Sequence, residues 1–424
     1  MMKFWMMLVA TLCFFSCGGE GVGQSQTRLR VMSEPWMFKK YPLREAKERF
    51  EKNHPGVDVE ILKAPDGYQN RLLVSMMSRR SDTDMFFGTV ENTVAVWAAR
   101  DLLLPWDDYL ETRPVLQRSA FIPTFYDMNR FGGKQYGLPI TAELFCFSVN
   151  KEMAARAGLL DQNGNMIPAK NWEEVFDYAR RMTVRDENGH VTVVGLAGNW
   201  SWPNSMLFSA MKAARGTLVD SESGQLLFDR PEVRELLTLT QAGAKEGITT
   251  LASMTDVNQP RSDFKARLVA MILTTHSRYL EAEETLGAGN ATIMPVPGGG
   301  GVIGGTRSVV IPKNSRAIGL ARQFVEEELM APYFSRFAWE KYGKLPCMLS
   351  VFETLDEPEA HWLASWAERS TADPMFRDEL PATDAIKRNV QGFLTGQMAL
   401  DPMLRRLQRE LAQLNLSDVR KHFE

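Results

Sequence analysis

The chain has 424 residues, of which 44% are hydrophobic and 24% are charged, values typical of a globular protein of two or three domains. Its formal net charge of −3 excludes the basic footprint of a nucleic-acid-binding domain. The five histidines form no HExxH pattern and the four cysteines form no CxxC pattern, so we expect no metal site, and no motif indicates a cofactor.

The first residues have the composition of a secretory leader. Lys3 precedes an uncharged run from Phe4 to Phe15, which is too short to span a bilayer and suits the apolar core of a signal peptide. Ser16 and Cys17 follow, and a small residue before Cys resembles the bacterial lipoprotein cleavage site. We expect residues 1–16 to be a signal peptide and residues 17–27 to be a lipidated Cys17 with its tether. The alternative is an ordinary signal peptide with an incidental cysteine.

The next hundred residues alternate between strand and helix patterns. Strands are expected at 28–33, 57–64 and 81–90, and helices at 43–53, 68–78 and 94–100. In the first helix the apolar residues Leu43, Ala46 and Phe50 share one face. This β-α-β-α-β order predicts an α/β fold with a parallel or mixed sheet and helices on both faces.

The remainder of the chain continues the alternation. The run from Ile140 to Val149 has no turn signal, which makes it a candidate crossover strand between two lobes. A helix is expected at 171–182, and a strand near 191–198 leads into the stretch GNWSWPNS. Further strands are expected at 267–276 and on both sides of the Gly-rich turn at 298–305. Helices are expected at 317–329, 331–342, 356–369 and 383–415.

Ligands of open α/β sheets bind at the carboxyl ends of the strands, so residues that follow the strands are the candidate binding residues. An indole can stack on the apolar face of a sugar, carboxylates accept hydrogen bonds from hydroxyl groups, and guanidinium groups donate them. The predicted ligand-binding residues are Glu34, Trp36, Glu91, Glu143, Trp200, Trp202, His276 and Arg307. We expect Trp200 or Trp202 to be the stacking platform.

Several of these residues have a structural alternative. Trp36 could pack on the first helix, and Glu34 and Glu91 could act as charges at helix starts. His276 could satisfy a hinge hydrogen bond. Glu143 lies in an apolar strand, where an unpaired charge is costly, and this favours a functional role.

The sequence leaves other ligands and a disulfide open. The three glutamates would also suit a polyamine, and Arg278 and Arg307 would suit a glycerol phosphate. Cys146 and Cys347 could be bridged or free, because an oxidising compartment permits a disulfide and free cysteines are often buried.

Six short motifs in order give the chain a family resemblance. They are FEKNHPGVDVEI, SDTDMFFG with AARDLLLPWDDYL, YGLPITAELFCFSVNKEMAARAGL, NWEEVFDYARRM with VVGLAGNWSW, SDFKARLVAMILTTHSRYLEAE, and MPVPGGGGVIGGTRSVVIPKNS. Together they resemble family 1 extracellular solute-binding proteins, the maltose-binding-protein type that serves ABC importers. The resemblance covers roughly residues 28–415.

The resemblance implies a two-lobed periplasmic-binding-protein fold of class II that closes around a ligand. Lobe I would comprise 28–141 plus 276–330, lobe II 146–270 plus 331–415, and the hinge crossovers 142–145 and 271–275. The implied protein is a monomer without catalytic activity, anchored at the periplasmic face of the cell envelope, that delivers a sugar to the transmembrane subunits of an ABC permease. A surface-anchored glycoside hydrolase and a sensor that presents its ligand to a membrane receptor are the alternatives.

Overall fold

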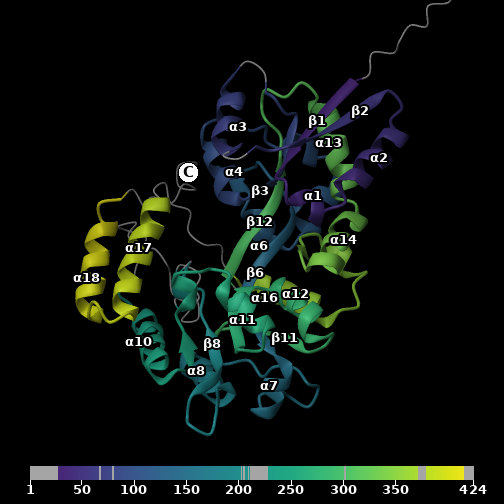
Figure 1. The fold of residues 1–424 in the computed structure, drawn as a ribbon. Coiled ribbons are helices and arrows are strands. Elements are labelled where there is room, and N and C mark those ends of the chain that lie inside the picture. The colour runs from purple at the N-terminus through teal and green to yellow at the C-terminus, as the bar shows by residue number, and fades with distance from the viewer. Residues whose placement is uncertain are drawn as a thin grey trace, which may run out of the picture.

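The computed structural model describes residues 27–65, 68–78, 81–201, 203, 206–208, 210, 228–299, 302–370 and 379–414. The expected signal peptide, Cys17 and Trp202 lie outside these residues. Figure 1 shows two groups of elements, one around β1 and α3 and the other around β8 and α8, joined by the long strands β6 and β12.

The first group confirms the predicted β-α-β-α-β order. Its elements are β1 (Thr27–Ser33), α1 (Met37–Lys40), α2 (Leu43–Asn53), β2 (Val57–Lys63), α3 (Tyr68–Met77), β3 (Met85–Thr89) and α4 (Glu91–Ala99). β1 pairs in parallel with β2 on one side and with β3 on the other. Leu43, Ala46 and Phe50 are buried against this sheet, as their spacing predicts.

The long run at 140–149 is one strand, β6 (Leu138–Asn150). It is preceded by α5 (Asp107–Leu110), η1 (Pro114–Leu116), η2 (Arg118–Ala120), α6 (Pro123–Asp127), β4 (Arg130–Phe131) and β5 (Lys134–Gln135). Residues 138–145 of β6 pair with β12 (Val302–Val310), and residues 145–149 pair with β10 (Val269–Thr275). The predicted crossover strand is therefore confirmed, because β6 contributes its two halves to two different strand sets.

The second group repeats the same kind of unit. It contains α7 (Lys151–Arg156), α8 (Trp172–Met182), β7 (Val184–Arg185), β8 (Val191–Ala197), α10 (Pro231–Glu246), β9 (Thr249–Thr250), η3 (Ala252–Met254), α11 (Gln259–Lys265), α12 (Arg278–Leu286) and β11 (Ala291–Met294). The strand order β9-β8-β10-β6 mirrors β2-β1-β3-β12 of the first group. A Cβ on Gly195 of β8 would lie 1.8 Å from the carbonyl oxygen of Ala179, so only glycine lets α8 pack this closely.

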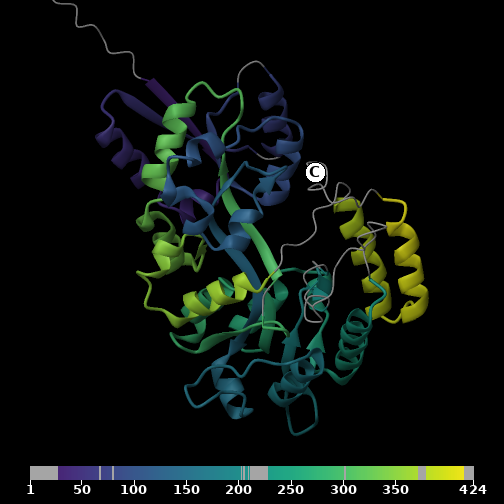
Figure 2. The same ribbon diagram turned by 180° about the vertical axis from the view of Figure 1, so that it is seen from behind.

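The carboxyl-terminal quarter of the chain is mostly helical. It holds α13 (Ile318–Phe324), η4 (Val325–Leu329), α14 (Pro332–Tyr342), β13 (Leu345–Pro346), α15 (Leu349–Phe352), α16 (Pro358–Glu368), α17 (Glu379–Leu394) and α18 (Leu400–Leu411). The single helix predicted at 383–415 is wrong, because the chain turns at Gly396, whose φ of 78° is left-handed. Figures 1 and 2 both place α17 and α18 beside α10.

The lobes divide the chain differently from the prediction. β10 and β11 both pair with the carboxyl-terminal half of β6, so the chain returns to the first group along β12 rather than at 271–275. Helix α14 also packs on the first group, since Phe334 lies 5.8 Å from the ring of Tyr41 and 5.6 Å from that of Phe87. Below, lobe I denotes the group around β1–β3 and lobe II the group around β8 and β10.

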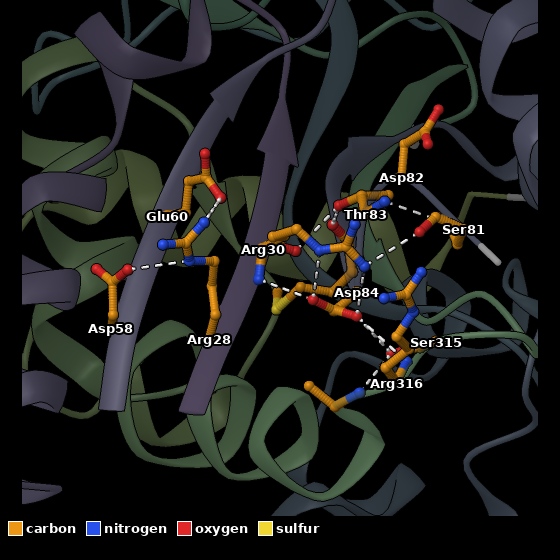
Figure 3. Close-up of polar contacts among 12 residues, drawn as sticks. Arg28, Arg30, Asp58, Glu60, Ser81, Asp82, Thr83, Asp84, Ser315 and Arg316 are labelled. Atoms are coloured by element: carbon orange, nitrogen blue, oxygen red, sulfur yellow. Dashed lines mark hydrogen bonds and ion pairs between the residues drawn. The ribbon is translucent and has the colours of Figure 1, made fainter. Parts of the chain in front are cut away.

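A largely buried ion pair joins β1 to the segment just before β3 (Figure 3). The guanidinium of Arg30 on β1 donates to both carboxylate oxygens of Asp84, at 3.0 and 3.1 Å. Ser315 Oγ and the backbone N–H of Arg316 also donate to Asp84. Burial raises the pKa of Asp84, but the hydrogen bonds from Arg30 outweigh it and hold that pKa below its usual value.

Within the described ranges, two further sequence expectations can be compared with the structure. Cys146 and Cys347 are both buried and unbridged. No helix there is long and apolar enough to cross a membrane, and no group of three or more His, Cys, Asp or Glu side chains is arranged to hold a metal ion.

Candidate functional site

The candidate site lies where the strand order reverses in each lobe. In lobe I, β1 and β3 are neighbours whose helices leave on opposite sides, and Glu34 and Glu91 follow their carboxyl ends. In lobe II, Asn199 follows β8 and His276 follows β10. Such reversal points leave a crevice outside the strand ends, which is where ligands of open α/β sheets bind.

Trp36 lies at the centre of the lobe I side. Its indole N–H donates to Glu34 at 2.6 Å, and the hydroxyl of Tyr68 donates to the other oxygen of the same carboxylate at 2.7 Å. The guanidinium of Arg307 lies 5.6 Å from the Trp36 ring and the ammonium of Lys40 lies 5.9 Å from it. The half-buried indole is thus held in place by Glu34, and Lys40 of α1 and Arg307 of β12 both lie near its ring.

Glu143, in the middle of β6, is the anionic centre of the site. Its side chain is 12% exposed, and it contacts Lys344 directly and Arg307 at 3.9 Å. Ser277 Oγ also donates to it at 3.2 Å. Burial raises the pKa of Glu143, but the charges of Lys344 and Arg307 outweigh it, so the carboxylate is ionised and its pKa lies well below the usual value.

The ring of His276 connects β6 with the end of α14. Its Nδ1 accepts the backbone N–H of Leu144 at 3.0 Å, so the ring proton lies on Nε2, which donates to the carbonyl of Gly343 at 2.6 Å. The ring is completely buried, and burial lowers the pKa of His276 to about 4. Both ring nitrogens are occupied by backbone groups, which agrees with the structural alternative of a hinge hydrogen bond, and the ligand contact of His276 stays a prediction.

Glu91 also has protein partners. It is the first residue of α4 and accepts from the backbone N–H and the hydroxyl of Thr306, at 2.9 and 3.1 Å. Gly305 precedes Thr306 with a φ of 101°, so a side chain there would be strained and would meet the Glu91 carboxylate. Glu91 therefore fixes the β12 backbone next to Arg307.

Of the two tryptophans predicted as stacking platforms, the structure describes only Trp200. Trp200 is 1% exposed and packs in the lobe II core with Met206 and Phe208, so it offers no free face to a sugar ring. The chain turns after Asn199, and the Trp200 backbone N–H donates to Ser253 Oγ at 2.8 Å, which directs the indole inward. Trp202 lies outside the described residues.

Sequence reasoning missed several residues that the fold brings to the site. Lys344 comes from the turn between α14 and β13, some 200 positions from Glu143 in the chain. Lys40, Tyr68 and Arg261 come from helices, and a rule based on residues after strands does not select them. A search for charged residues in short helices and turns with few acidic neighbours would have selected Lys40 and Lys344.

The structure therefore connects Glu34, Trp36, Arg307 and Glu143 into one chain of contacts, with Glu91 bracing β12 and His276 bracing the crossover. On the lobe II side a narrow recess opens between Asn199, Arg261 and Thr274, with about 10 Å³ of room, enough for about one water molecule. These cations, one indole and hydrogen-bonding groups can bind a polar solute.

Two βα lobes that share long crossover strands, with a polar site between their strand ends, define a two-lobed binding protein. The chain belongs to the bacterial extracellular solute-binding protein family, whose sequence pattern matches residues 39–327. This agrees with the resemblance drawn from the six motifs. The family and the structures similar to this chain consist of binding proteins rather than enzymes.

Relatives known from sequence are distant. Proteins of Brucella abortus (strain 2308) and Brucella suis biovar 1 (strain 1330), each described as a binding protein, are 26% identical over 282 residues. These matches span 64% of this chain and 64% of the length of each relative.

Solved structures share the fold over nearly the whole chain. The sugar-binding protein MalE of Xanthomonas citri is 18% identical with a TM-score of 0.78, over 91% of this chain and 97% of that one. The GacH receptor of Streptomyces glaucescens, solved unliganded and with acarbose, is 19% identical with a TM-score of 0.71, over 92% and 99%. A Thermotoga lettingae ABC transporter solute-binding protein bound with α-D-tagatose is 19% identical with a TM-score of 0.72, over 93% and 100%.

Proposed function

We propose that this protein is the substrate-binding component of an ABC importer and that it binds a sugar or oligosaccharide between its two lobes. Family membership and the sugar complexes of proteins with the same fold support the proposal. The observation that carries it is the half-buried Trp36, held by Glu34 next to Arg307 at the strand ends. An indole surrounded by hydrogen-bonding charged groups suits a sugar ring, which has an apolar face and a rim of hydroxyl groups.

Binding would act through closure of the lobes. A solute that contacts both lobes favours the form in which they approach each other, and that form would be recognised by the permease subunits. β6 and β12 are the elements that such a movement would bend. Under this proposal the protein is a monomer and Cys17 carries the lipid that keeps it at the periplasmic face.

A thermal-shift screen of mono- and oligosaccharides, polyamines and phosphate esters tests the binding step. A bound solute raises the melting temperature according to its concentration and affinity, and chromatography of the same samples measures turnover. A saccharide that stabilises the protein and remains intact supports the proposal. Hydrolysis of that saccharide would refute it in favour of a glycoside hydrolase.

Trp36→Ala then tests the site. Truncation of an aromatic binding residue commonly costs about 1–3 kcal/mol, so we expect the Kd of the best saccharide to rise by roughly fivefold to a hundredfold. Trp362→Ala on α16 is the matched control, because Trp362 is also a half-buried indole packed on the same core. Equal affinities of Trp36→Ala and wild type would place the binding site elsewhere.

The anchor and the delivery step need cellular measurements. Wild-type protein labelled with a radioactive fatty acid should lose the label and leave the membrane fraction when Cys17 is changed to Ser. Deletion of the gene should abolish uptake of the saccharide found in the screen. Unchanged uptake together with a lost transcriptional response would favour the sensor alternative.

A further inference from the structure

Cationic side chains are concentrated in the site between the lobes. They come from α1, α11, α12, β12 and the turn before β13, so lobe I, lobe II and the crossover all contribute. The six residues are Lys40, Arg261, Lys265, Arg278, Arg307 and Lys344. Most of them are at least partly buried, where an uncompensated charge is costly.

Two carboxylates neutralise only part of this charge. Glu143 is shared by Lys344 and Arg307, and Glu281 is shared by Lys265 and Arg278. Each carboxylate therefore serves two cations. If Glu34 and Glu91 at the neighbouring strand ends are included, the six cations still exceed the four carboxylates.

Two of the cations have no carboxylate partner among the residues that the structure describes. Lys40 contacts only aromatic rings, at 5.9 Å from Trp36 and 5.6 Å from Tyr342. Arg261, beside the lobe II recess, has only a 3.5 Å contact with Asn258 Oδ1. The Nε of Arg278, which lies near both, is buried and has no acceptor in the described part of the chain.

The pKa shifts of Lys40 and Arg261 agree with their lack of a carboxylate partner in the described part of the chain. Burial, together with the charges of Lys344 and Arg278, lowers the pKa of Lys40 to about 8, although the charges of Glu143 and Glu281 act in the opposite direction. Burial also lowers the pKa of Arg261, and Arg278 again adds to the effect. Adding an anion would relieve the repulsion between these groups.

We propose that the solute bound here is an anionic saccharide, whose carboxylate or phosphate group lies between Lys40 of lobe I and Arg261 and Arg278 of lobe II. This inference rests on the proposed saccharide-binding function and specifies its substrate class. Charge-assisted hydrogen bonds from guanidinium and ammonium groups are the strongest that such an anion can receive. The same excess of positive charge repels a polyamine.

Titration calorimetry on the mature protein tests the charge requirement with matched probes. Galacturonate and galactose, glucuronate and glucose, and their oligomers differ mainly in one carboxylate, and glucose 6-phosphate supplies the phosphate form. We expect at least one anionic member to bind tenfold or more tightly than its neutral partner, and its Kd to rise with sodium chloride. Comparison of the Kd values of the carboxylate and phosphate probes identifies which anionic group the site prefers.

Single substitutions identify which cations bind the anionic group of the probe. Lys40→Met should weaken binding of the anionic probe about tenfold and weaken binding of its neutral partner by a clearly smaller factor, and Arg261→Met should do the same. Lys39→Met is the matched control, because Lys39 is the exposed neighbour on α1. Thermal unfolding of each variant without ligand verifies that it is folded.

The outcomes separate the two proposals. Neutral sugars that bind as tightly as their acidic partners, or a polyamine that binds more tightly than either, would overturn the anionic-solute inference. If neutral and acidic sugars bind equally tightly, the proposed saccharide-binding function is still supported. If no saccharide in the panel binds, neutral or acidic, the proposed function fails as well.

Discussion

The buried ring of His276 should make the stability of this protein depend on pH in a defined window. The ring is neutral in the folded protein, with the proton on Nε2, and connects Leu144 of β6 with Gly343 at the end of α14. Burial lowers its pKa from 6.5 to about 4. Between pH 6.5 and 4 the unfolded chain binds a proton that the folded protein does not, so the free energy of unfolding falls as the pH falls.

The change in the free energy of unfolding follows from the change in the pKa of His276. One pKa unit corresponds to about 1.4 kcal/mol, so a shift from 6.5 to about 4 amounts to roughly 3 kcal/mol. This stabilisation is complete above pH 6.5 and lost by pH 4. Glu143, Glu281 and Asp84 lose stabilisation at lower pH, because their folded pKa values lie below the usual carboxylate range.

The assay compares wild type with His276→Asn in urea, followed by tryptophan fluorescence, at several pH values from 7.5 to 4. Asn cannot take up the proton, so the stability advantage of the wild type at pH 7.5 should shrink by about 3 kcal/mol at pH 4. His361→Asn is the control, because His361 is exposed on α16, where it contacts the carbonyl of Leu355 and the ring of Phe352. Parallel curves for wild type and His276→Asn over the whole range would refute this account of the hinge histidine.

Four further substitutions, at Glu143, Lys344, Asp84 and Gly195, test the packing and the ion pairs by denaturant unfolding. Glu143→Gln leaves buried cations unpaired and should lower the free energy of unfolding by about 3–5 kcal/mol. Adding Lys344→Met to this variant should recover more than half of that loss. Additive losses in the double variant would contradict the pairing of Glu143 with Lys344. Asp84→Asn removes the anion that Arg30 binds and should cost about 2 kcal/mol, a cost absent if the pair is only a surface contact. Gly195→Ala forces a Cβ into the Ala179 carbonyl and should prevent normal packing of α8, so native stability in this variant would contradict the close approach.

The sequence was sufficient to predict the βα units and the crossover strand. Alternation and helix spacing record which side chains face the core, so β1 to β3, α2 and α8 follow from local patterns. The lobe boundaries did not follow, because they depend on which strand pairs with which half of β6. Pairing between strands that are distant in the chain cannot be predicted from the local sequence of β10, β11 or α14.

The site was predictable only in part for the same reason. The sequence selected Trp36, Glu143 and Arg307 as residues next to strand ends or within an apolar strand, and the fold brings them together, whereas their contact with a ligand stays a prediction. Trp200 satisfied the same rule, yet its loop turns back and buries the indole. Whether a residue after a strand faces the crevice or the core depends on the next turn, and neither Gly198 nor Asn199 determines that direction from composition alone.

The burial of Trp200 changes what each lobe can contribute to binding. Lobe I keeps the half-buried indole Trp36, whereas lobe II presents Arg261 and Arg278 at its strand ends. Under the proposed function, the sugar ring would therefore rest on lobe I and its charged group would attract the cations of lobe II. Closure would then be driven by neutralisation across the crevice rather than by two facing aromatic rings. Small-angle scattering measures how compact the protein is with each sugar. If the acidic sugar makes the protein more compact and its neutral partner does not, the result supports this division of roles between the lobes. Equal compaction by both sugars would argue against it.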